Sequence, residues 1–230
     1  MTSIPNKTRL PGDRLLTAAA LATVIALCWA WIAAMALDMY GPMTGCSSWM
    51  MTRDWDFPHQ ALLFAMWAVM MTGMMLPSAM PAMFHYASAA PGNLTAERTL
   101  SRVFTFAAGY LMIWILFSLA ATALQLWLTS VSLLSPMMAL RSRWLGAALI
   151  VIAVAYQFTP WRRRCLECCR CRADDIVNDI APLRAGIQNG LSCLGCCWAV
   201  MLLLFAGGVM NLWWLAALTI FVVLEKVTLP

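Results

Sequence analysis

Long apolar stretches alternate with short charged segments along the chain, and this pattern predicts membrane-spanning helices. Several stretches reach the roughly 20 apolar residues that a helix rising 1.5 Å per residue needs to cross a bilayer. The candidate spans lie near residues 15–37, 61–84, 103–128, 144–158, 191–207 and 212–229. We therefore expect an all-α, polytopic transmembrane helix bundle of about six spans. It would form a single integral membrane domain over residues 1–230, with a Cys- and Arg-rich loop at 160–190.

Two of these boundaries have an alternative interpretation. The first span follows a basic start and contains Ala34-Met35-Ala36, which resembles a signal-peptidase site. Its apolar run is longer than the 7–15-residue core of a signal peptide, so a retained helix is favoured. Residues 191–224 contain no charged residue. Gly207-Gly208 and Asn211 predict a turn that divides this stretch into two helices, and one long tilted helix is the alternative.

Composition supports the membrane assignment and excludes other classes. Hydrophobic residues make up 63% of the chain and charged residues 11%, whereas soluble domains have roughly 25% charged residues. Such a chain cannot cover a water-facing surface, so the lipid bilayer is its expected partner. The sequence has no stripe of basic and aromatic residues, which argues against a nucleic-acid partner.

The distribution of Lys and Arg predicts the orientation in the membrane. With the N-terminus inside, twelve of the fifteen basic residues fall in cytoplasmic segments, and only Arg53, Arg141 and Arg143 fall outside. Cytoplasmic loops are enriched in Lys and Arg. We therefore expect a multi-pass protein of a bacterial-type cytoplasmic (inner) membrane, with the N-terminus and residues 160–190 in the cytoplasm. Thiols stay reduced there, which favours metal binding over disulfides.

The cysteines form the same short pattern twice. Seven of the nine cysteines lie within residues 165–197, and the C-x-x-C-C motif that begins at residue 165 recurs 28 positions later. Thiolates are good ligands for Cu(I) and Zn(II). We expect the second copy to supply the core ligands of a metal site. The first copy would form an adjacent site or add ligands to the site of the second copy. For the second copy, packing of Cys as a small hydrophobe is the alternative. The candidate ligands are Cys193, Cys196 and Cys197, followed by Cys165, Cys168, Cys169 and Cys171.

Methionine is concentrated in the first half of the chain. Twelve of the eighteen methionines lie between residues 35 and 83. Met70 and Met74 are four residues apart and share a helical face. We expect Pro77 and Pro81 to interrupt this helix on either side of Met80 and before His85. Thioethers are soft ligands that suit Cu(I), although Met also fills gaps between helices. The second-rank candidate ligands are Met70, Met74, Met80 and His85.

Two further groups of polar residues lie near the ends of apolar spans. The outer segment between the first two spans contains Asp38, Cys46 and His59 together with several methionines. It could capture a metal, but a folded amphipathic lid is slightly favoured. Glu225 and Lys226 end the last apolar run. We expect them to be a neighbouring pair that reaches the membrane interface.

Several segments resemble the DUF2182 family, which is described as predicted metal-binding integral membrane proteins and sometimes glossed as copper chaperones. The resemblance lies in Trp67–Pro81, Gly190–Met201, Phe205–Trp213, Thr159–Cys168 and Leu224–Lys226. It implies metal binding within a membrane domain, with copper as the metal. Family members commonly continue beyond the Glu-Lys pair with another apolar segment, so this chain is expected to be short by one helix.

Taken with the residues, the resemblance favours membrane-embedded binding and transfer of Cu(I), with Zn(II) as the alternative ion. The partner would be a metal donor or acceptor protein, or a larger membrane complex. Two other functions stay open: an accessory or assembly subunit of such a complex, and a membrane thiol oxidoreductase that uses its C-x-x-C pairs. The sequence lacks a thioredoxin-like context and any recognisable catalytic arrangement, so a non-enzymatic role is favoured.

Overall fold

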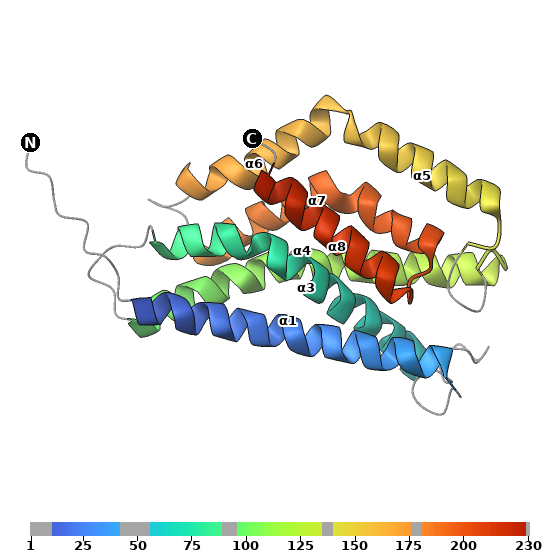
Figure 1. Cartoon of the computed structure of the whole chain (residues 1–230), viewed down its shortest axis with the longest axis horizontal. Coiled ribbons are helices and arrows are strands. Elements are labelled where there is room, and N and C mark those ends of the chain that lie inside the picture. The colour runs from blue at the N-terminus through green and yellow to red at the C-terminus, as the bar shows by residue number, and fades with distance from the viewer. Residues whose placement is uncertain (1–10, 42–55, 89–95, 135–139, 176–180, 229–230) are drawn as a thin grey trace, which may run out of the picture.

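The fold is a bundle of helices. A computed structural model describes residues 11–41, 56–88, 96–134, 140–175 and 181–228, which form helices with no strand among them. The expected all-α class is confirmed for this part of the chain. Figure 1 shows the helices lying side by side along one long axis. Their bounds are α1 (Pro11–Tyr40), α3 (Phe57–Ser88), α4 (Ala96–Ser130), α5 (Arg143–Gln157), α6 (Pro160–Asp175), α7 (Pro182–Gly207) and α8 (Leu212–Thr228).

Several of these helices are long and apolar enough to cross a membrane. Within the described residues, α1, α3, α4 and α7 qualify individually, and α5 with α6 would make a fifth span if the bent pair crosses as one. Helix α8 has 17 residues, fewer than the roughly 20 that a span usually needs. The chain is thus a membrane protein with four or five candidate spans by length and composition, and a sixth stays a prediction.

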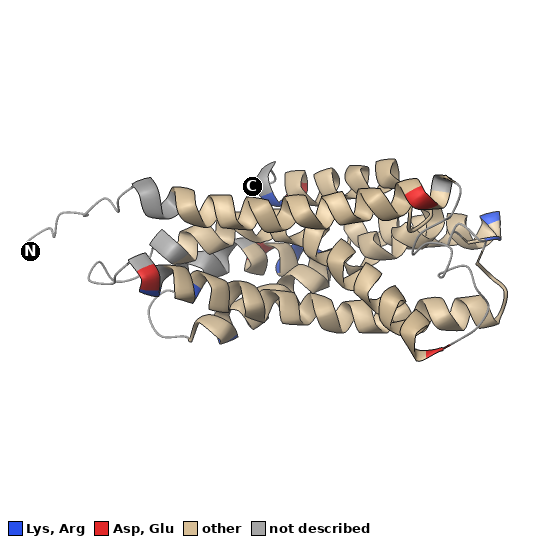
Figure 2. Cartoon of the chain, turned by 90° about the horizontal axis from the view of Figure 1, so that it is seen from below, with Lys and Arg blue, Asp and Glu red and all other residues tan. Residues whose placement is uncertain are grey.

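Exposed aromatic side chains mark one end of the bundle. Trp127, Trp144 and Trp213 are 59%, 79% and 88% exposed, and they belong to the end of α4 and the starts of α5 and α8. Figure 1 shows these three helix ends gathered at the same end of the molecule. Figure 2 shows long uncharged stretches along the helices beyond that end. Because Trp is enriched at membrane interfaces, this end fits one boundary of the hydrocarbon region.

The segment 160–190, expected as a loop, is largely helical. Helix α5 ends at Gln157, and α6 begins at Pro160 and leaves at 67° to α5. Proline lacks an N–H and disfavours helical geometry in the residue before it, so the sequence breaks the helix at this point. Proline is well suited to the first position of the next helix. Helix α6 then packs against α7, which places Cys165 and Cys169 beside α7.

Helix α7 begins at Pro182, well before the expected start near residue 191. Its first turns look polar, but they pack tightly against α4. The α-carbons of Gly109 and Gly186 lie so close to the facing backbone that any side chain at either position would collide with it. Small residues allow such close approach of helices in membranes. As a result, the stretch from Cys193 to Cys197 lies in the middle of α7, not at a helix start as expected.

The close contact of α4 and α7 makes Gly186 sensitive to substitution. In a Gly186→Ala variant the new methyl group would collide with the Phe106 carbonyl of α4. Overpacking of this kind costs about 1–3 kcal/mol, so we expect a lower melting temperature in detergent. Gly146 in α5 is a matched control, because a side-chain carbon there would meet no atom within 4 Å. Gly146→Ala should leave the melting temperature unchanged or raise it, and equal losses in both variants would contradict this packing.

Helix α3 is continuous through both of its prolines, so the expected interruption does not occur. Pro77 cannot bond to the carbonyl of Gly73, one turn earlier. The indole Nε1 of Trp29 in α1 donates to that carbonyl at 3.2 Å instead. A neighbouring helix therefore satisfies the group that proline leaves unbonded, as spanning helices require.

Candidate metal centre

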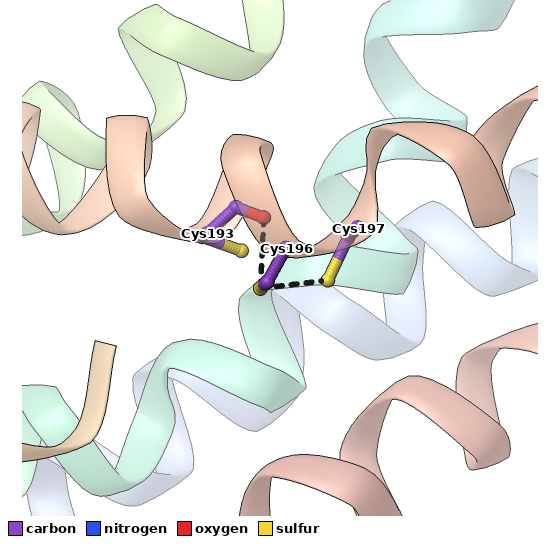
Figure 3. Close-up of side chains that lie close together, drawn as sticks. All are labelled: Cys193, Cys196 and Cys197. Atoms are coloured by element: carbon purple, nitrogen blue, oxygen red, sulfur yellow. Dashed lines mark hydrogen bonds between the residues drawn. The ribbon is translucent and has the colours of Figure 1, made fainter. Parts of the chain in front are cut away.

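Three thiols from α7 form a compact buried cluster. Cys193, Cys196 and Cys197 are spaced i, i+3 and i+4, so they share one helical face. Their Sγ atoms all lie within 4.8 Å of one another, and the residues are 0%, 1% and 1% exposed. Cys196 Sγ lies 3.3 Å from Cys197 Sγ and 3.1 Å from the Cys193 carbonyl oxygen, as Figure 3 shows. All three are free thiols.

The first cysteine copy is divided between the two faces of α6. Cys165 faces α7, since its Sγ lies 2.7 Å from the place where a side-chain carbon of Gly195 would be. Cys169 lies on the same face, interacts with the thiols of Cys193 and Cys196, and has its Sγ 3.9 Å from the Asn189 carbonyl. Cys168 is exposed. The structure therefore brings two cysteines of this copy to α7.

Cys171 belongs to α6, but its side chain lies outside the described residues. Its predicted role as a ligand therefore stays a prediction.

Lys226 of α8 points into the cluster. Its Nζ donates to Cys193 Sγ at 2.7 Å and to the Ser78 hydroxyl at 2.9 Å. The Ser78 hydroxyl in turn donates to the Met75 carbonyl at 2.8 Å. The expectation that Lys226 reaches the membrane interface beside Glu225 is wrong, because this face of α8 is turned towards α3 and α7.

Tyr110 of α4 is the second polar neighbour of Cys193. Its hydroxyl oxygen lies 3.0 Å from Cys193 Sγ and 3.2 Å from the Met75 carbonyl oxygen. A tyrosine hydroxyl has one proton to donate. It can bond to the carbonyl while a Cys193 thiol donates to it, or it can donate to a Cys193 thiolate. Tyr110 and Lys226 together can therefore stabilise negative charge on this sulfur.

A buried ion pair holds the end of α8 against α6. Arg162 and Glu225 form a salt bridge, and their side chains are 6% and 10% exposed. The two charges of the Glu225-Lys226 dipeptide thus contact different helices, Glu225 reaching α6 and Lys226 reaching α3 and α7. The ion pair fixes the last turn of α8, from which Lys226 extends to the thiols.

The predicted methionine and histidine ligands are distributed along α3. Met70 and Met74 are fully buried in the hydrophobic core. Met80 is half-buried, and His85 is exposed seven residues beyond Ser78. Helix α3 is linked to the cluster indirectly: the Met75 carbonyl accepts a hydrogen bond from Tyr110, and the Ser78 hydroxyl accepts one from Lys226. The Met75 carbonyl and the Ser78 hydroxyl thus contact the two polar neighbours of Cys193, Tyr110 and Lys226, and His85 lies farther along the helix.

Only part of the expected outer segment can be located. Cys46 and the methionines between residues 42 and 55 lie outside the described residues. Met39 at the end of α1 and His59 at the start of α3 are buried. Whether this segment captures a metal or forms a lid therefore stays open.

Sequence reasoning missed Tyr110, Ser78 and Arg162 and misinterpreted Lys226. One signal was available: polar groups within apolar helices need hydrogen-bond partners, and ionisable residues within spans usually serve a function. That signal identifies the residues as unusual, but it does not identify their partners.

Apolar helices, a buried cluster of free thiols and a lysine against one of them define a helical membrane protein with a centre suited to soft metals. A model of the PpoB2 family, described as copper chaperone, matches residues 64–229. The chain belongs to this copper chaperone family. The matched region includes all of α4 to α8 and most of α3, and therefore every residue of the cluster. Curated proteins and solved structures give no significant match.

Proposed function

We propose that this protein binds Cu(I) as cargo at Cys193, Cys196 and Cys197 and passes it to another protein at the membrane. The observation that supports this proposal most directly is the mutual proximity of three buried free thiols, whose Sγ atoms lie within 4.8 Å of one another. Soft sulfur ligands favour Cu(I). Membership of a copper chaperone family supports the same ion.

Zinc is the alternative ion. Structural zinc sites take four ligands in a tetrahedral arrangement, and Cys169 of α6 could add a fourth thiol to the three on α7. The Lys226 ammonium, which lies against Cys193, is a cation and cannot act as a ligand. Membership of the copper chaperone family favours copper over zinc, whereas the number of cysteines is compatible with both ions.

The other predicted ligands fit a route to and from the cluster. Among the cysteine side chains that the structure describes on α6, Cys168 is the exposed one, so an incoming or outgoing ion could meet its thiol first. Cys165 and Cys169 lie between it and α7, and Cys171 follows on the same helix. Met70 and Met74 would serve an ion that approaches through the core of α3, and Met80 and His85 one that approaches from its end.

The DUF2182 resemblance supports the same proposal. The segments that carry it, from Trp67 to Lys226, all lie within the matched residues 64–229. We therefore infer that both descriptions concern one family of membrane copper proteins.

The direct test is Cu(I) binding by the whole chain. The protein would be purified without oxygen in detergent, loaded with Cu(I) and titrated with a chromophoric Cu(I) chelator. We expect one tightly held copper per chain, with X-ray absorption showing sulfur as its ligand. Nitrogen or oxygen coordination, or no binding, would contradict the proposal. Formation of a reversible disulfide between Cys193 and Cys196, in protein that binds no copper, would favour a thiol oxidoreductase.

The proposed location is a bacterial-type cytoplasmic membrane with the N-terminus and α6 on the cytoplasmic side. Cys168 allows a test because it is exposed. A membrane-impermeant thiol reagent should label it in inverted vesicles and leave it unlabelled in intact cells. A Cys168→Ser variant would identify the labelled site. Strong labelling of Cys168 in intact cells would reverse the orientation.

A further inference from the structure

Lys226 brings a positive charge into contact with the proposed metal ligands. We propose that Lys226 is a specificity-determining residue that makes this site prefer monovalent thiophilic ions, Cu(I) and Ag(I), over divalent ones such as Zn(II) and Cd(II). This inference rests on the proposed function, because it concerns the ion that Cys193, Cys196 and Cys197 hold.

The position of the Lys226 ammonium determines which ions the site disfavours. The Lys226 Nζ atom lies 2.7 Å from Cys193 Sγ, so an ion bound to that sulfur would lie a few ångströms from the ammonium. Coulomb repulsion between the ammonium and the ion is proportional to the charge of the ion. A divalent ion on the same ligands is therefore repelled twice as strongly as a monovalent one. The attraction between the ammonium and the thiolates is the same for both ions and cancels in the comparison.

The surroundings keep this charge in place and weakly screened. Lys226 is half-buried and its Nζ contacts the fully buried Cys193, and partly buried charges are screened much less by salt than exposed ones. Ser78 accepts a hydrogen bond from the Lys226 ammonium at 2.9 Å, which anchors it on α3. The nearest acidic residue along α8, Glu225, is paired with Arg162. That carboxylate is thus neutralised by another partner and does not cancel the charge of Lys226.

A merely structural lysine would behave differently. If Lys226 only fastened α8 to α3, its loss would weaken the binding of every ion by the same factor. If it only favoured thiolate formation, the affinities for monovalent and divalent ions would again fall together. The ratio of the two affinities therefore isolates the proposed role.

The test compares Ag(I) and Cd(II), two thiophilic ions with filled d shells that differ in charge. Competition titrations on the full chain in detergent would give both affinities for the wild type, Lys226→Gln and Lys226→Arg. Gln removes the charge and keeps a donor for Ser78, whereas Arg keeps the charge. We expect Lys226→Gln to reduce the preference for Ag(I) over Cd(II) by about 10- to 100-fold, and Lys226→Arg to retain it.

Thermal melting would confirm that each variant is folded, and Lys226→Leu provides a second neutral variant if Gln is not accommodated. An unchanged ratio in a folded neutral variant would overturn the inference and leave the proposed function standing. A wild-type protein that binds neither Cu(I) nor Ag(I) would overturn the proposed function itself. The two failures are therefore distinguishable in one series of measurements.

Discussion

Replacing Cys193, Cys196 and Cys197 together by Ser should remove nearly all tight Cu(I) binding, with an expected loss of affinity of at least about 100-fold. Hydroxyl groups are poor ligands for soft ions, and the substitution removes every sulfur of the cluster on α7. Copper content after anaerobic loading and dialysis, together with competition against a chromophoric chelator, measures the loss.

Two controls make this result specific. Cys28 of α1 and Cys168 of α6 are the matched cysteines, one far along the chain from the cluster and the other exposed. Ser at either position should leave the affinity of the cluster close to that of the wild type. A second triple variant with Ala avoids placing three hydroxyls in an apolar interior and should lose copper equally. If the folded triple variants keep their full copper content, the three thiols are packing groups.

Breaking the buried ion pair between Arg162 and Glu225 should have the second-largest expected effect, which is a loss of protein stability. We expect Arg162→Met to destabilise the protein by about 3–5 kcal/mol, because it leaves the Glu225 carboxylate buried without its partner. Reversible unfolding in mixed micelles, or the melting temperature in detergent, would measure the change. Since the pair positions the last turn of α8, the contact between Lys226 and Cys193 should loosen as well.

The neighbouring Arg163 gives the matched comparison. It is exposed on α6, so Arg163→Met should change the stability by less than about 0.5 kcal/mol. The double variant Arg162→Met/Glu225→Met removes both charges and should recover much of the lost stability, since apolar replacement of a buried pair is often neutral. Equal effects of the substitutions at Arg162 and Arg163 would show that the ion pair adds nothing.

The parts of this molecule that were predictable from sequence depend on local pattern. Apolar runs predict helices in a membrane because the bilayer requires them. The close grouping of Cys193, Cys196 and Cys197 follows from their spacing once that stretch is helical. Neither inference needs any knowledge of how the helices pack.

The parts that were missed depend on contacts between distant segments. Lys226 and Tyr110 are 33 and 83 residues away from Cys193 in the chain, so no periodicity connects them. Helix α6 looks like a loop because five arginines and three acidic residues interrupt its apolar positions. Its apposition to α7 becomes visible only where Cys165 meets Gly195. Packing between helices decided these features.

The burial of the thiols under α6 has a consequence for the rate of copper release. A sulfur with 0% exposure, such as that of Cys193, cannot meet the ligand of an acceptor protein while the covering helices stay in place. Direct exchange with an acceptor, without passage along the thiols of α6, must therefore wait for a helix to move, and α6 is bound to its neighbours mainly through α7 and α3. Helix displacements of this kind take microseconds to milliseconds or longer. For this direct exchange, the residence time of copper would be set by the opening frequency of α6, and affinity and delivery rate could be varied independently of each other.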